Sequence, residues 1–185
     1  MRIRGSVLLP IAGFSVFALV LISTLVLALA GLLPLHQGRF SIWLLVICFG
    51  LACYNTSTAW LAQRITYPLF AYVDESKFLG YHSSYEDRIP LPVILPVLLL
   101  MNLSGVLVWF PPREMPEWVV LSGLLIQVIT ALSTILLQVP AHKELSVGFQ
   151  TKAHSRLVKT NWIRTIGLTA HTVILFWALV HPQFR

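Results

Sequence analysis

Charged residues are scarce in this chain, and their scarcity excludes an ordinary soluble globular protein. Only 11% of the 185 residues are Asp, Glu, Lys or Arg, whereas 57% are apolar. Cysteine is also scarce, because only Cys48 and Cys53 occur, five positions apart and so on different faces of one predicted helix. That spacing disfavours a disulfide, a CxxC redox pair and a thiolate metal site. The composition is that of an integral membrane protein that does not use cysteine chemistry.

Long uncharged runs divide the chain into predicted membrane-spanning segments. A helix needs about 20 apolar residues to cross a hydrocarbon core of about 30 Å. Five runs reach that length, at 5–38, 40–63, 89–112, 118–142 and 165–184. We therefore predict an all-α bundle of five transmembrane helices in one membrane domain, 1–185. It would comprise an additional N-terminal helix at 1–39 and a four-helix core at 40–185, with cytoplasmic loops at 64–88 and 140–164.

Basic residues are distributed unevenly between the predicted loops. Most of the Lys and Arg residues fall in the N-terminus and in the loops at 64–88 and 140–164. Because basic residues are retained on the cytoplasmic side, we predict a cytoplasmic N-terminus. The first apolar run is longer than the 7 to 15 residues of a secretory signal, so we predict that it is retained. The net charge of +6 is explained by topology and contact with the lipid bilayer, and we predict no nucleic-acid partner.

Polar side chains within the predicted helices gather toward the cytoplasmic side. One stripe, on the fourth predicted helix, follows steps of three and four residues and consists of Gln127, Thr130, Thr134 and Gln138. A second stripe shares one sector of the last helix and consists of Asn161, Arg164, Thr165, Leu168 and His171. We expect the threonines to bond their own backbone or neighbouring helices. His171 lies too deep to reach water and needs a partner, a ligand or a cavity. Arg164 either extends to the headgroups or binds an anion inside the bundle.

The segment "YPLFAYVDESKFLGYHSSYEDRIPLP" is rich in aromatic residues, and we expect part of it to lie along the membrane surface. His82 and Glu86 are four positions apart, which suits a carboxylate-oriented imidazole, a metal-ligand pair or a local hydrogen bond. Together with His142 and His154 they offer enough nitrogen and oxygen ligands for a non-haem metal. Because no compact signature such as HExxH is present, we assign no metal, and the sequence identifies no cofactor.

Three blocks of the chain resemble a known group of proteins. "TYPLFAYVDESKFLGYHSSYEDRI", "QVPAHKELSVGF" and "RLVKTNWIRTIGLTAHTVILFWAL" resemble the recurring blocks of a bacterial membrane family distantly similar to the anthrone-oxygenase-like four-helix proteins. The resemblance implies a four-helix core in the bacterial inner (cytoplasmic) membrane and oxidation of polycyclic phenolic substrates without a known organic cofactor. It implies His82, His142, Asn161 and Arg164 as catalytic-site residues.

Two classes of function stay open at this point. In the first, the protein is an oxidoreductase or oxygenase that takes a lipophilic aromatic or quinone-like substrate from the cytoplasmic leaflet. His82 or His142 would then act as the base, and Arg164 with Asn161 would stabilise a phenolate or enolate. In the second, it is a non-catalytic accessory subunit that binds a partner helix, a pigment or a lipid in a larger membrane complex. We also predict that the two cytoplasmic segments meet over the end of the bundle, with His82 and His142 in one neighbourhood and Asn161 close by.

Overall fold

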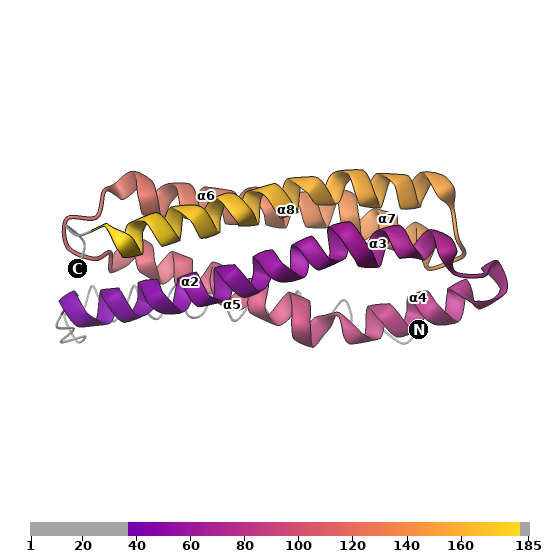
Figure 1. Ribbon diagram of the computed structural model, residues 1–185, viewed down its shortest axis with the longest axis horizontal. Coiled ribbons are helices and arrows are strands. Elements are labelled where there is room, and N and C mark those ends of the chain that lie inside the picture. The colour runs from indigo at the N-terminus through magenta and orange to yellow at the C-terminus, as the bar shows by residue number, and fades with distance from the viewer. Residues whose placement is uncertain (1–36, 182–185) are drawn as a thin grey trace.

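The chain forms long helices that run back and forth along one axis, as a computed structural model shows for residues 37–181 (Figure 1). The elements in chain order are α2 (Gln37–Leu61), η1 (Ala62–Thr66), α3 (Tyr67–Leu69), η2 (Phe70–Tyr72), α4 (Glu75–Arg88), η3 (Pro90–Ile94), α5 (Leu95–Trp109), α6 (Glu117–Ser133), η4 (Thr134–Gln138), α7 (Val139–Leu145) and α8 (Thr151–Val180).

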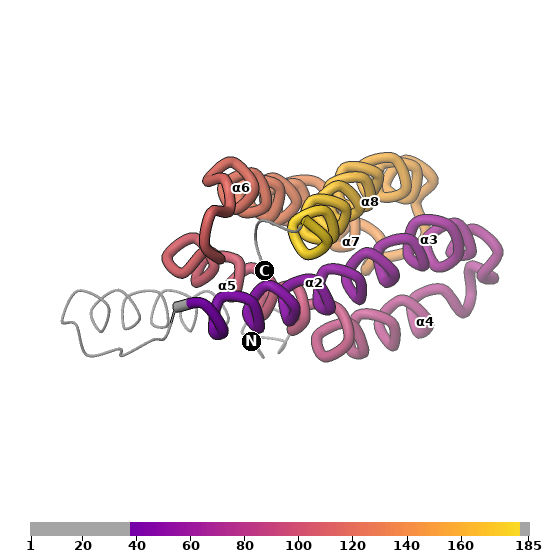
Figure 2. Tube along the Cα trace, turned by 60° about the vertical axis from the view of Figure 1, so that its left-hand side comes forward, coloured from indigo at the N-terminus to yellow at the C-terminus, as the bar shows by residue number. Residues whose placement is uncertain are grey.

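Four helical stretches of this all-α structure are long and apolar enough to cross a membrane: Gly38–Tyr72, Pro90–Trp109, Glu117–Leu145 and Thr151–Val180. They form a ring, in which α2 and α6 each pack against both α5 and α8. Figure 2 shows the ring as two layers, with α6 and α8 above α2 and α5. The predicted four-helix core is therefore confirmed as four apolar helices. The predicted N-terminal helix lies before the described residues.

Both segments predicted as cytoplasmic loops are largely helical. The stretch 64–88 holds the end of the first span and α4, and 140–164 holds α7 and the first half of α8, leaving only residues 146–150 between those two helices. Charged residues mark where hydrocarbon ends, but Lys, Arg and Glu continue a helix readily in water. The α4 helix also runs along the bundle axis (Figure 1), rather than across the bundle end as expected of a surface-lying segment.

Within residues 37–181, three π-helical turns occur in the long helices, and each ends two residues before a proline. These are η1 before Pro68, η3 before Pro96 and η4 before Pro140. A proline ring collides with the carbonyl group four residues earlier in an α-helix, and in each case that carbonyl belongs to the wider π turn. A π turn brings residues five positions apart onto one face, and across η4 the buried residues are Ser133 and Gln138. The Gln138 amide donates to Ser133 Oγ at 3.0 Å.

Buried side chains form three tiers along the bundle. An apolar core fills the end near the α5–α6 connection and includes Leu45, Cys48, Leu100, Val119 and Leu175. A second core, richer in aromatic residues, fills the opposite end and includes Tyr67, Phe70, Phe78, Leu145 and Leu157. Buried polar residues of the middle tier include Gln63, Gln127, Gln138, Asn161, Arg164, Thr165 and His171. The middle tier carries most members of the two polar stripes, including Arg164, which is buried inside the bundle.

Tryptophan side chains indicate where the bilayer lies. Trp118 and Trp177 are in contact near the α5–α6 end, and Trp60 and Trp162 are in contact farther along, with ring centroids 5.4 Å and 5.6 Å apart. Indole rings favour the membrane–water interface. At 1.5 Å per residue, α8 from Trp162 to Trp177 spans about 22 Å, comparable with the hydrocarbon thickness of about 30 Å. The beginning of α8, which α7 packs against, and α4, which lies toward the same end of the bundle in Figure 1, are therefore expected to extend beyond the hydrocarbon.

Candidate functional site

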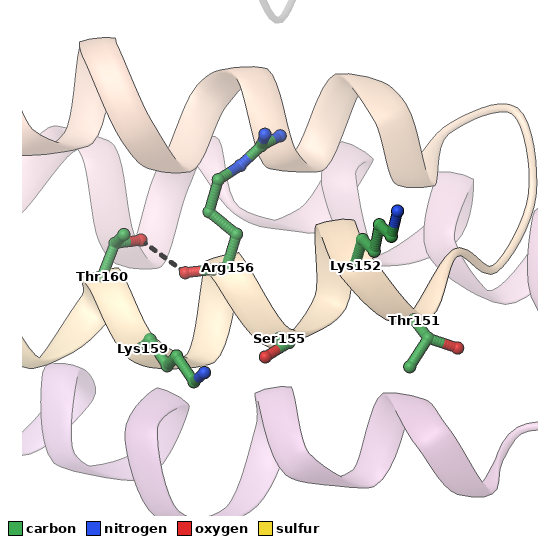
Figure 3. Close-up of a pocket in the computed structure, with 6 residues that line it drawn as sticks. All are labelled: Thr151, Lys152, Ser155, Arg156, Lys159 and Thr160. Carbon is green, nitrogen blue, oxygen red and sulfur yellow. Dashed lines mark hydrogen bonds between the residues drawn. The ribbon is translucent and has the colours of Figure 1, made fainter.

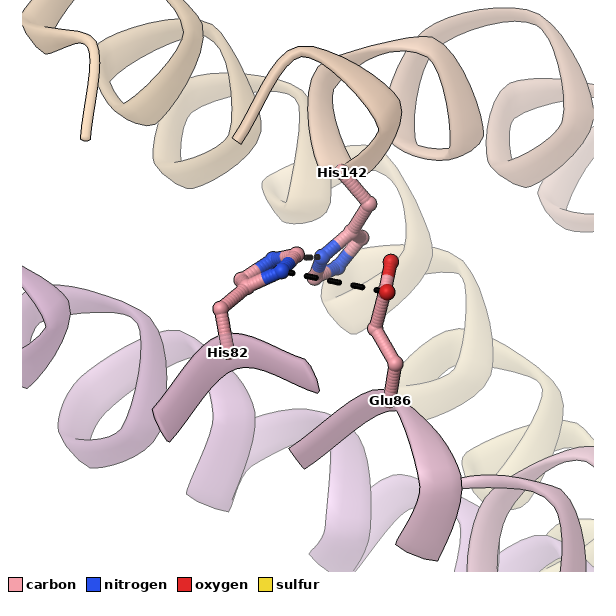
Figure 4. Close-up of side chains that lie close together, drawn as sticks. All are labelled: His82, Glu86 and His142. Atoms are coloured by element: carbon pink, nitrogen blue, oxygen red, sulfur yellow. Dashed lines mark hydrogen bonds and ion pairs between the residues drawn. The ribbon is translucent and has the colours of Figure 1, made fainter. Parts of the chain in front are cut away.

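Two histidines from different helices meet in this extended part of the bundle. His82 of α4 and His142 of α7 point toward each other (Figure 4), and His82 Nε2 lies 3.2 Å from His142 Nδ1. The His82 side chain is fully buried, and His142 is partly buried. The predicted meeting of the two histidines is thus observed, across 60 residues of sequence.

Glu86 completes a group of three side chains. It lies one turn after His82 on α4, and its Oε2 is 3.9 Å from His82 Nδ1, which is beyond hydrogen-bonding distance. On the other side, His142 Nε2 lies 3.4 Å from the hydroxyl group of Tyr67. Each imidazole therefore has one nitrogen facing the other histidine and one nitrogen near an oxygen atom.

Aromatic rings enclose the two imidazoles. The ring of Phe78 stacks on His82 with centroids 5.6 Å apart, and the ring of Tyr85 stacks on His142 with centroids 6.0 Å apart. Phe70 packs edge-on against both histidines. These rings fix the orientation of the imidazoles and keep water from their faces.

Burial sets the protonation of the side chains that α4 contributes. Burial lowers the pKa of His82, so this imidazole is neutral at pH 7 and has a lone pair available. Burial raises the pKa of Tyr85, and Tyr67 adds to that effect while the positive charge of Arg164 opposes it. Tyr85 therefore keeps its proton and can donate a hydrogen bond.

Arg164 places a buried positive charge beside this group. Its side chain is only 9% exposed, and its Nε has no hydrogen-bond partner. The charge acts on both Tyr85 and His142. Between residues 38 and 181, no carboxylate forms an ion pair with Arg164. A buried guanidinium without a counter-ion is costly, and such a position suits a bound anion.

Asn161 lies in the polar tier and bonds to other residues of that tier. Its amide donates to Gln63 Oε1 at 2.9 Å and contacts Thr165 Oγ1 at 3.3 Å. It makes no hydrogen bond to His82 or His142. The structure thus brings His82 and His142 together, leaves Arg164 within electrostatic reach of His142 and Tyr85, and gives Asn161 an interhelical contact.

His171 and several threonines of the spans have ordinary partners. Gln127 donates to His171 Nδ1 at 2.8 Å, which supplies the partner that His171 was predicted to need. Thr130, Thr134 and Thr169 each donate to a carbonyl group of their own helix. The backbone bonding expected of the threonines is confirmed.

Sequence reasoning missed the aromatic residues that enclose the histidines. Tyr67, Phe78 and Tyr85 were assigned to the membrane surface, but Tyr67 and Phe78 are buried and Tyr85 is partly buried. The signal was present, because Phe78, His82 and Tyr85 recur at the spacing of one helical face. His154, considered as a further metal ligand, instead contacts the Tyr67 carbonyl oxygen through Nε2 at 2.8 Å.

An open hollow of about 540 Å³ lies along the first half of α8 (Figure 3). Its lining consists of Thr151, Lys152, Ser155, Arg156, Lys159 and Thr160. Arg156 forms an ion pair with Glu144 at 2.6 Å. These residues lie beyond the level of Trp162, where basic side chains meet lipid headgroups.

Comparison of the chain with protein-family models, with curated proteins and with solved structures gives no match. The described residues form a helical protein with four helices that are long and apolar enough to cross a membrane.

Proposed function

We propose that this protein is a membrane oxidoreductase that oxygenates a lipophilic aromatic, phenolic or quinone-like compound. The observation that carries the proposal is Arg164, a buried cation without a carboxylate partner among the described residues, acting on Tyr85 and His142. A guanidinium in that position stabilises an oxyanion that appears when a bound phenol or ketone loses a proton. The three sequence blocks that resemble anthrone-oxygenase-like proteins support the same chemistry.

The histidine pair supplies the base. His82 is neutral at pH 7, and the two imidazoles together take up one proton from the substrate. The substrate would enter where His142, Tyr85 and Glu86 are partly exposed, next to the level of the headgroups. With dioxygen as the co-reactant, the enolate carbon forms a C–O bond to O₂. Protonation and loss of water then convert one CH₂ group and one O₂ into one C=O group and one H₂O.

Arg164→Lys tests the anion-binding role, because lysine keeps the charge but loses the planar fork. We expect oxygen uptake to fall by about 100-fold, the loss typical when an oxyanion donor is removed. The measurement is oxygen consumption by membranes that contain the protein, with a panel of lipophilic phenols, hydroquinones and anthrones, normalised to membrane abundance. Arg164→Leu should lose uptake completely.

Arg156→Lys is the matched control, because Arg156 is an exposed arginine of the same helix. This variant should consume oxygen like the unaltered protein. Equal uptake by Arg164→Lys and Arg156→Lys would reduce Arg164 to a membrane anchor. Uptake no greater than that of membranes lacking the protein, across the whole panel, would contradict the oxidoreductase and favour an accessory subunit.

A further inference from the structure

The facing nitrogens of His82 and His142 have the separation of two ligands of one metal ion. Two imidazole nitrogens bound at about 2.1 Å with an angle of about 100° between them are about 3.2 Å apart. The observed distance between His82 Nε2 and His142 Nδ1 is 3.2 Å. We propose that His82, His142 and Glu86 bind one divalent first-row transition-metal ion. The proposal deepens the proposed function, on which any role of the ion in oxygenation rests. An ion would take the lone pairs of both imidazoles, so with an ion bound the ion, and not the free histidine pair, would promote loss of the substrate proton by lowering the pKa of the bound phenol or ketone.

The outer nitrogens of both rings fit this arrangement. If the facing nitrogens give their lone pairs to an ion, His82 Nδ1 and His142 Nε2 each carry a proton. The N–H group of His142 then lies 3.4 Å from the Tyr67 hydroxyl oxygen, and the N–H group of His82 lies on the side of Glu86, whose carboxylate serves in this proposal as a ligand of the ion. Metal-binding histidines commonly direct their second N–H toward a carboxylate or another oxygen.

A plain hydrogen bond between the two imidazoles is the competing explanation. Either ring could donate it, but only one of these two arrangements agrees with the surroundings. If His82 donates from Nε2, its buried Nδ1 becomes a bare acceptor that faces the Glu86 carboxylate, another acceptor. Only donation from His142 Nδ1 avoids this conflict. A metal ion leaves both rings with a proton on the outer side.

Glu86 supplies the oxygen ligand. One ligand atom from each of His82, Glu86 and His142 lies within 4.8 Å of the others, and Figure 4 shows the Glu86 carboxylate directed toward the two rings. The Glu86 side chain is 26% exposed, so it can shift the short distance to an ion. Two imidazoles and one carboxylate leave coordination positions open and suit Fe²⁺, Co²⁺ or Zn²⁺ rather than Mg²⁺ or Ca²⁺.

Rigid surroundings favour binding. Phe78 and Tyr85 stack on the imidazoles, and both come from α4, the helix that also carries two of the three ligands. An ion would join α4 to α7. Binding would therefore stabilise the packing of α4 as well as fill the site.

The test is titration of the full-length, tag-free protein in detergent with Co²⁺, after treatment with a chelator. We expect one equivalent of Co²⁺ to bind, with visible absorption bands of a nitrogen- and oxygen-liganded ion, and Zn²⁺ to displace it. His82→Gln and His142→Gln should weaken binding by more than about 100-fold, and Glu86→Gln by about 10- to 100-fold. His154→Gln is the control and should bind Co²⁺ normally, because His154 contacts the Tyr67 carbonyl outside the group.

The metal site is refuted if the unaltered protein binds neither Co²⁺ nor Zn²⁺. It is also refuted if the two single variants, Glu86→Gln and His142→Gln, both bind Co²⁺ normally. Elution volume and helical circular dichroism confirm that each variant is folded. If the histidine variants do not accumulate, Glu86→Gln decides the question, because its side chain is partly exposed. Oxygen uptake separates the two proposals. Uptake by the metal-free protein would refute a catalytic role of the ion but leave the oxygenase standing. Metal binding without oxygen uptake would refute the oxygenase but leave the metal site standing.

Discussion

Among single residues, Asn161 differs from Arg164 in having its donor group satisfied. Its amide donates to Gln63 Oε1 at 2.9 Å and so links α8 to the π turn η1. Interhelical hydrogen bonds of this kind contribute about 1 kcal/mol in membrane proteins. The contact gives Asn161 a stabilising role, and its role at a catalytic site stays a prediction.

A double-mutant cycle tests that role. Asn161→Ala and Gln63→Ala should each destabilise the protein, and the pair should show a coupling energy of about 1 kcal/mol, because either change breaks the same bond. The measurement is reversible unfolding in mixed detergent micelles. Additive effects would show that the bond does not contribute, and a loss of oxygen uptake in Asn161→Ala at full stability would return Asn161 to the catalytic site.

The sequence allowed some of these residues to be predicted, but not their partners. That Gln127, Asn161 and His171 share the faces of polar stripes followed from helical periodicity, because polar side chains in a membrane helix avoid lipid. The sequence left Arg164 open between the headgroups and the inside of the bundle. The approach of His82 to His142 followed from loops expected on the same side. The contacts of Tyr67 and Tyr85 did not, since an amphipathic aromatic ring suits an interface and a buried site equally well.

At the level of elements, α6 and α8 approach each other closely at two glycines. A Cβ atom at Gly123 would lie 2.8 Å from His171 Nε2, and one at Gly167 would lie 2.7 Å from Thr130 Cγ2. Neither neighbour moves freely, because His171 is bonded to Gln127, and Thr130 is β-branched and bonded to its own helix. Small residues permit such close contact between membrane helices.

Gly123→Ala and Gly167→Ala should therefore destabilise the protein, by about 1 to 3 kcal/mol each. Gly50→Ala is the matched control, because Gly50 is an exposed helical glycine and a Cβ atom there meets nothing within 4 Å. Its effect should be neutral or slightly stabilising, as expected from helix propensity. Thermal unfolding monitored by circular dichroism measures all three. Equal melting temperatures for the three variants would show that α6 and α8 do not pack this closely.

Element boundaries were less predictable than element number. The four apolar helices of the core were foreseen because hydrophobic length is a strong signal. Their ends were not, because charged residues signal the edge of the hydrocarbon and not the end of a helix, as α8 shows by beginning at Thr151. The π turns were also missed, although a proline in a helical pattern signals local distortion.

For the whole molecule, the distribution of charge along the bundle predicts its orientation. The end that holds α4, α7 and the beginning of α8 carries most of the basic residues, which include Lys77, Arg88, Lys143, Lys152, Arg156 and Lys159. Arg113 lies in the α5–α6 connection, at the opposite end. The positive-inside rule then places the histidine pair on the cytoplasmic side.

Cysteine labelling tests this orientation. In a background with Cys48→Ala and Cys53→Ala, we expect Ser76→Cys and Ser146→Cys to react with an impermeant maleimide only after the membrane is opened. Arg113→Cys should react in intact cells, because it lies at the other end of the bundle. Labelling of Ser76→Cys and Ser146→Cys from outside, with Arg113→Cys protected, would invert the orientation and place the substrate in the outer leaflet.

The π turn η4 makes the direction of the His142 side chain depend on the number of residues that precede it in the helix. A π turn holds one residue more than an α-helical turn, and α-helical residues are about 100° apart around the axis. Deletion of a single codon within η4 would leave a hydrophobic helix but turn every later side chain, including His142, away from its present direction. The histidine pair therefore depends on the number of residues between Ser133 and His142 as well as on the two histidines themselves. A related protein with both histidines but one residue fewer between Ser133 and His142 would have lost the pair.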